Sequence, residues 1–149
     1  MAVTAQASDF FTVRPRQTTE SHGRVRTAYV EHVQAGAGDA GSTIDLWRVP
    51  AGRVRIVGYL SRLRTSAFGA GVTLDMGHTG FSSRDGSEIA ADGDALLDGK
   101  AVGSAGAFAL DEDTFLIDGT GGTVIRATVL GGAIPAGATI KATIAYVVD

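Results

Sequence analysis

The chain has no cysteine among its 149 residues, so disulfide bonds and thiolate metal sites are excluded. No stretch reaches 18 uninterrupted apolar residues, and we therefore expect no segment that crosses a membrane. The first ten residues lack a basic segment followed by an apolar core, which argues against a secretory signal. These absences predict a soluble protein that folds in the reducing compartment where it is made.

Motifs of enzymes and metal centres are also missing. The three histidines lack the H-x-x-x-H and H-E-x-x-H spacings of zinc sites, and no G-x-S-x-G elbow of a hydrolase occurs. Residues 36–41, GAGDAG, spell a dinucleotide-binding motif, but a strand-like pattern follows where that motif needs a helix. We therefore predict a protein that is not an enzyme and has no catalytic residue, metal or cofactor.

Calcium binding stays open as an alternative for one acidic segment. Oxygen-rich loops suit Ca²⁺, but the spacing of the five carboxylates does not match an EF-hand loop. The main interpretation is a solvated acidic loop that contains Asp85, Glu88, Asp92, Asp94 and Asp98.

Charge is divided unequally along the chain. Residues 1–64 hold nine arginines against five acidic residues, a net charge of +4, whereas residues 65–149 hold four basic residues against eleven acidic ones, a net charge of −7. Such a division can mark a surface for nucleic acid or for an acidic partner, or simply arginines that alternate outward on strands. Because aromatic residues are few and are not interleaved with arginine on one strand, we expect no nucleic-acid partner.

Glycine is abundant, at 21 residues, and apolar residues repeatedly alternate with polar ones. This period-two pattern is typical of strands, which we expect at 24–34, 43–49, 53–60, 72–76, 107–118, 123–130 and 138–148. Only residues 92–100 are expected to form a helical turn, with Asp92 or Asp94 as its N-cap. The profile predicts an all-β, single-domain β-sandwich of jelly-roll type over residues 24–149.

A short phrase occurs twice, as VPAGRVRI at 49–56 and as IPAGATIKA at 134–142. Proline suits the second position of a tight turn and cannot donate within a sheet, so each phrase is interpreted as a turn that begins a strand. The predicted structural turn residues, with glycine at positive φ, are Pro50, Gly52, Pro135 and Gly137.

Residues 1–23 are predicted to form an extended N-terminal arm outside the sandwich. They show no sustained period and carry Phe10 and Phe11 close to Arg14 and Arg16. Apolar anchors flanked by arginine are favoured at interfaces, so these four residues are predicted to contact a neighbouring subunit or a capsid. The alternative is a frayed terminus without a partner.

Three stretches carry a resemblance to a known class of proteins: WRVPAGRVRIVGYL, GVTLDMGHTG and ADGDALLDGKAVGSAGA. Over residues 43–108 the sequence resembles the small all-β capsid-associated proteins of tailed bacteriophages. The matching positions are fold markers, namely Pro50, Gly52, Asp75 and Gly77. The resemblance implies a non-enzymatic cement or decoration protein, often a trimer. It would be made in the host cytoplasm and bind the outer capsid surface, where it locks neighbouring copies of the major capsid protein together.

Self-association is also predicted from residues 53–63. Val57 and Leu63 have the same parity as Arg53, Arg55 and Tyr59, so both faces of this segment carry apolar residues, as at a subunit interface. The two arginines and the tyrosine are accordingly candidate contact residues.

Two other classes of function stay open. A head-fibre or tail-associated module that binds a host-surface glycan would need an exposed cluster of Trp or Tyr, and the chain has only Trp47, Tyr29, Tyr59 and Tyr146. An enzyme could assemble its site from residues far apart in the sequence.

Overall fold

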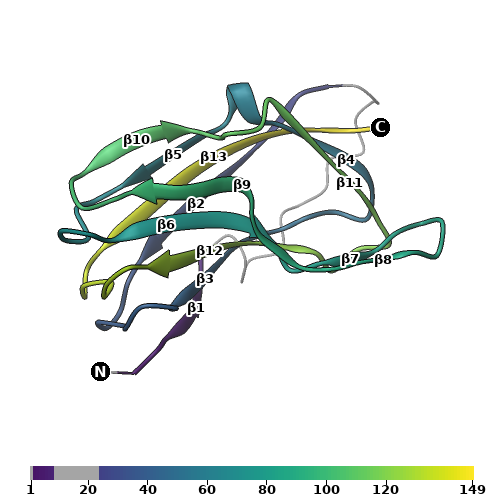
Figure 1. The fold of residues 1–149 in the computed structure, drawn as a ribbon. Helices are drawn as coiled ribbons and strands as arrows, with labels where there is room; N and C mark the ends of the chain where they lie inside the picture. Colours follow the sequence, from purple (N-terminus) through teal and green to yellow (C-terminus); the bar gives the residue numbers. More distant parts are fainter. Residues whose placement is uncertain (1, 9–23) are drawn as a thin grey trace.

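Two sheets packed face to face form the body of the protein, as the computed structural model of residues 2–8 and 24–149 shows (Figure 1). The five-stranded sheet has the order β1 (Ala5–Ala7), β3 (Thr43–Arg48), β12 (Val124–Leu130), β6 (Thr73–His78) and β9 (Asp92–Ala101). The six-stranded sheet contains β10 (Gly106–Ala109), β5 (Arg62–Thr65), β13 (Thr139–Val148), β4 (Gly52–Val57), β11 (Thr114–Gly119) and β2 (Arg26–Val33). A small hairpin pairs β7 (Phe81–Ser82) with β8 (Glu88–Ile89).

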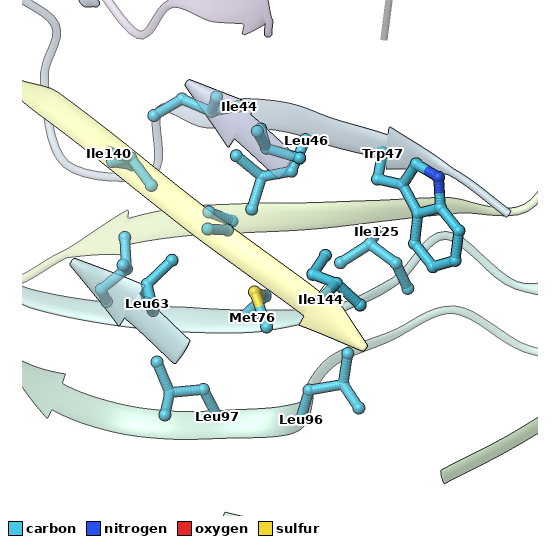
Figure 2. Close-up of a cluster of buried hydrophobic side chains, with 14 of the residues drawn as sticks. Ile44, Leu46, Trp47, Leu63, Met76, Leu96, Leu97, Ile125, Ile140 and Ile144 are labelled. Carbon is cyan, nitrogen blue, oxygen red and sulfur yellow. The ribbon is translucent and has the colours of Figure 1, made fainter. Parts of the chain in front are cut away.

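Alternation along the strands builds the core between the sheets (Figure 2). The predicted inward faces of β6, β12 and β13 are confirmed, since Leu74, Ile125 and Ile140 are fully buried. Each such aliphatic side chain contributes about 1.5–3 kcal/mol through removal from water. Trp47 closes one end of the core, with its ring centroid 4.7 Å from that of Tyr146. No helix in the described part of the chain is long and apolar enough to cross a membrane.

The segment expected as the strand 53–60 contains an insertion. β4 and β5 lie end to end along one edge of β13, and the three-residue 3-10 helix η1 (Gly58–Leu60) separates them. The insertion changes which parity faces inward, so Val54 and Ile56 are buried before it and Leu63 after it. Leu63 is therefore a core residue, and the prediction that it shares the face of Arg53 and Arg55 is wrong. Val57 keeps the parity of those two arginines and is nevertheless buried at the end of β4.

Residues 92–100 form most of strand β9, so the predicted helical turn is also wrong. β9 pairs with β6 through a register that shifts twice, and these irregularities bury both Leu96 and Leu97. Gly77 permits the approach, because a Cβ there would lie 1.9 Å from the carbonyl oxygen of Asp92. Pairing with β6 thus outweighs the local capping signal. The expected strand 107–118 is interrupted as well, by a loop at 110–113 between β10 and β11.

The two Pro-Ala-Gly phrases precede β4 and β13. Gly52 and Gly137 have φ angles of 112° and 78°, in the region that favours glycine. In the second copy the Ala138 N–H donates to the carbonyl oxygen of Pro135 at 3.2 Å. Pro135 is therefore the first residue of this turn and not the second, and Gly137 occupies the third position, where a type II turn requires positive φ.

We expect Gly52→Val and Gly137→Val to lower the free energy of unfolding by about 1 kcal/mol or more each, because a β-branched residue is strained at positive φ. Thermal melts would measure the loss. Gly36→Val is the matched control, because Gly36 lacks a positive φ and has open space around it. Melts of the two turn variants that equal the parent's would contradict this role of the glycines.

A histidine is buried where β6 meets the β7–β8 hairpin. The Gly80 N–H donates to His78 Nδ1 at 3.1 Å, and the imidazole lies against the rings of Phe81 and Phe115. Burial lowers the pKa of His78 from 6.5, and the charge of Asp92 offsets part of that effect. The folded protein therefore favours a neutral His78.

The free energy of unfolding should fall as the pH is lowered through about 6.5, because the unfolded chain then binds a proton that the folded chain does not. His78→Asn keeps an acceptor for the Gly80 N–H but cannot titrate, so it should flatten this pH dependence. Urea unfolding from pH 5 to pH 8 would test it. The same slope in parent and variant would show that His78 is not the group responsible.

Candidate functional site

Five cationic side chains project from the outward face of the six-stranded sheet. Arg53 and Arg55 lie on β4, Arg62 and Arg64 on β5, and Lys141 lies opposite Arg64 on β13. They share one face because the residues between them point into the core and because η1 corrects the parity between β4 and β5. We call these five residues the basic face.

The carboxylates of the chain neutralise only part of the basic face. Asp149 Oδ2 lies 3.1 Å from Arg55 Nη2 and 3.8 Å from Arg53 Nε. Glu31 Oε1 lies 3.1 Å from Lys141 Nζ, and this contact raises the pKa of the lysine. Within the described residues, Arg62 and Arg64 have no ion-pair partner.

The two unpaired arginines line a concavity of about 490 Å³, whose other walls are Tyr29, Lys141 and Thr143. Thr143 pairs with Arg62 on one side and with Tyr29 on the other, so β13 forms the floor between the cations and the phenol. The Tyr29 side chain is 53% exposed. We call this concavity the basic groove. Its guanidinium, ammonium, hydroxyl and phenol donors suit carboxylates or phosphates of a partner.

A second concavity, of about 610 Å³, carries the opposite charge and is called the acidic groove. It lies where β9 approaches the 110–113 loop and is lined by Asp92, Asp94, Asp98, Asp111 and Glu112, together with Ala95 and Phe115. The Asp98 N–H donates to the Asp111 carboxylate at 2.8 Å, and Lys100 Nζ lies 3.3 Å from it. These contacts lower the pKa of Asp111, the first more than the second.

The remaining carboxylates of the acidic groove are not compensated. Among the described residues, no cation forms an ion pair with Asp92, Asp94, Asp98 or Glu112. The neighbouring carboxyl of Asp92 raises the pKa of Asp94, as expected for two close carboxyl groups. The calcium alternative receives no support, because the described residues contain no group of three or more His, Asp or Glu that could hold a metal.

The structure separates the contact residues that the sequence predicted. Arg53 and Arg55 are on the basic face, whereas Tyr59 lies on η1 with 64% of its side chain exposed. Phe10, Phe11, Arg14 and Arg16 lie outside the described residues. Sequence reasoning missed Arg62 and Arg64, although both alternate with buried residues in the printed sequence. The sequence-based prediction assumed one uninterrupted strand, in which odd-numbered residues stay on the outward face. Because η1 interrupts that strand, the even-numbered Arg62 and Arg64 face outward instead.

Comparisons with known proteins agree with the fold. No protein-family model matches the chain, and no curated protein matches its sequence. A chain in the capsid of Ralstonia phage GP4 superposes with a TM-score of 0.69 at 21% identity, over 98% of this chain and 99% of that one. A chain in the capsid asymmetric unit of cyanophage Pam1 superposes with a TM-score of 0.62 at 17% identity, over 91% and 95%. The predicted all-β, jelly-roll-like sandwich is thereby confirmed.

Proposed function

We propose that the protein is a non-enzymatic structural component of a bacteriophage or phage-like virion. The observation that carries this proposal is the similarity over nearly the full length of two capsid chains, 99% of one and 95% of the other. The shared fold thus spans nearly all of this chain and of both matched chains. A small sandwich with polar, charged outer surfaces is suited to contact its neighbours through those surfaces.

The specific role we infer is that of a cement or decoration protein on the outer capsid surface. Such a protein acts by burying area across the seams between copies of the major capsid protein, so that the shell cannot open without losing these contacts. The resemblance of residues 43–108 to capsid-associated proteins supports this role and suggests a homotrimer. The exposed cations of the basic face provide polar contacts of the kind found at interface rims.

The glycan-binding alternative gains no support from the aromatic residues. Trp47 is buried in the core and Tyr146 packs against it, so neither ring offers a platform for a sugar. Tyr29 lies on the outward face of β2 and Tyr59 on η1, in separate elements. We therefore propose only the structural role.

Capsids that lack the protein should bind it when the purified chain is added, at a regular position in every repeat of the shell. The decorated particles should also open at a higher temperature, because each seam then has additional buried contacts. Cryo-electron microscopy would locate the bound copies, and release of packaged DNA on heating would measure the stabilisation. Particles that stay bare at saturating protein concentration would overturn the cement role.

Residues 5–7 of the predicted arm form β1 in the five-stranded sheet, so the prediction that residues 1–23 lie outside the sandwich is wrong for them. We propose that the part of the arm with Phe10 and Phe11 holds the protein on the capsid or on a neighbour. Deleting residues 1–22 would also remove β1, which pairs with β3 and ends next to the buried Ser8. The sharper variant is Phe10→Ser with Phe11→Ser, which should weaken capsid binding and leave the β circular-dichroism spectrum unchanged. Val3→Ser, at an exposed position ahead of β1, is the control. Equal binding by the Phe variant and the parent would show that the arm makes no contact of consequence.

A further inference from the structure

We propose that the basic groove of one copy binds the acidic groove of a second copy, so that the protein associates with itself head to tail. This inference deepens the proposed function and rests on it, because it assigns the surfaces through which copies would join on a capsid. The partner is a second copy of this chain, and the recognition chemistry is guanidinium on carboxylate.

The two grooves match in the groups they leave unpaired. Arg62 and Arg64 have no carboxylate partner within the described residues. The other three cations of the basic face form ion pairs, with Asp149 or with Glu31. A guanidinium presents a rigid fork of donors that fits a carboxylate with two parallel hydrogen bonds. Tyr29 and Thr143 add hydroxyl groups at the same concavity. The groove therefore offers an acidic partner both charge and hydrogen-bond donors.

The acidic groove supplies such a partner. Asp94 and Asp98 are exposed on β9 and have no cation of their own. The carboxyl of Asp92 raises the pKa of Asp94, so the two carboxylates repel each other in a single copy. Arginines of a second copy would relieve this repulsion.

The positions of the grooves determine the kind of contact. The basic groove lies on the outward face of the six-stranded sheet, across β5, β13 and β2. β9 is the last strand of the other sheet (Figure 1). The acidic groove lies along this strand, beside the 110–113 loop. Because different surfaces meet, the contact is heterologous, and it generates a ring if the rotation closes or an open chain if it does not.

Two charge-neutralising variants test the contact in solution, without capsids. Arg62→Gln with Arg64→Gln removes the unpaired cations, and Asp94→Asn with Asp98→Asn removes two carboxylates at nearly constant volume. The parent should form an oligomer whose dissociation constant rises with salt, because screening acts on charge pairs at the rim. Each variant alone should raise that dissociation constant about tenfold or more.

Mixing the two variants gives the decisive result. The basic-groove variant keeps an intact acidic groove, and the acidic-groove variant keeps an intact basic groove. An equimolar mixture should therefore form a one-to-one complex with twice the chain mass of 15.2 kDa, although each variant alone is mainly monomeric. Light scattering coupled to size exclusion measures the mass, and one isotopically labelled variant identifies the composition.

Control variants make the same change in charge elsewhere. Arg84→Gln with Arg126→Gln removes two cations, and Asp85→Asn with Glu88→Gln removes two carboxylates. All four residues lie outside both grooves, so these variants should assemble as the parent does. Circular dichroism verifies that every variant keeps the sandwich.

Three results would overturn the inference. They are a parent that is monomeric at 100-fold above the concentration used for capsid binding, groove variants that assemble as well as the parent, and a mixture that stays monomeric.

Capsid binding is measured separately. A monomeric parent that still decorates capsids, and loses decoration with the Arg62 and Arg64 substitutions, would assign the basic groove to the capsid and leave the cement role standing. Normal self-association without capsid binding would instead overturn the cement role alone.

Discussion

Pairing along β13 is the constraint on which the rest of the structure depends. This strand has hydrogen-bonded neighbours on both sides, with β2 on one and β4 and β5 in succession on the other. Its inward residues Ile140 and Ile144 lie in the middle of the core (Figure 2), and Ala142 between them is buried as well. Its outward residues Lys141 and Thr143 form the floor of the basic groove. A shift of β13 by one residue would expose the core face and dismantle the groove at once.

The insertion η1 explains how one sheet carries a continuous row of cations. Without it, the alternation of β4 would run on and turn Arg62 and Arg64 away from the face of Arg53 and Arg55. Gly58 allows the insertion, because a Cβ at this position would lie 1.7 Å from the carbonyl oxygen of Glu112. The Gly58 N–H donates to the carbonyl oxygen of Asp113 at 2.7 Å and so ties η1 to the 110–113 loop. The same glycine thus fixes the basic face and one wall of the acidic groove.

The predictable parts of the fold are those where alternation runs uninterrupted. β2 alternates throughout and β12 and β13 alternate over most of their length, and the sequence locates all three to within two residues at each end. The prediction fails at β9, because its pairing with β6 contains two irregularities that bury adjacent leucines and remove the alternation. The acidic segment is visible in the sequence, but its contact with the 110–113 loop is not, since that contact joins a strand of one sheet to a loop between two strands of the other.

The division of charge along the sequence becomes a division in space because the chain places its two halves differently. Four arginines of the first half point outward from β4 and β5 of one sheet, and three carboxylates of the second half, Asp92, Asp94 and Asp98, lie on β9 of the other sheet. Elsewhere the described carboxylates often find a cation within the chain, as Asp45 does with Arg126 and Asp118 with Arg84. Exposed ion pairs of this kind contribute little to the free energy of unfolding, so leaving the charges of the basic and acidic grooves unpaired lowers stability only slightly. Charges that folding does not need to pair are available to a neighbour, so the sign of each groove bears on the proposed self-association more than on folding.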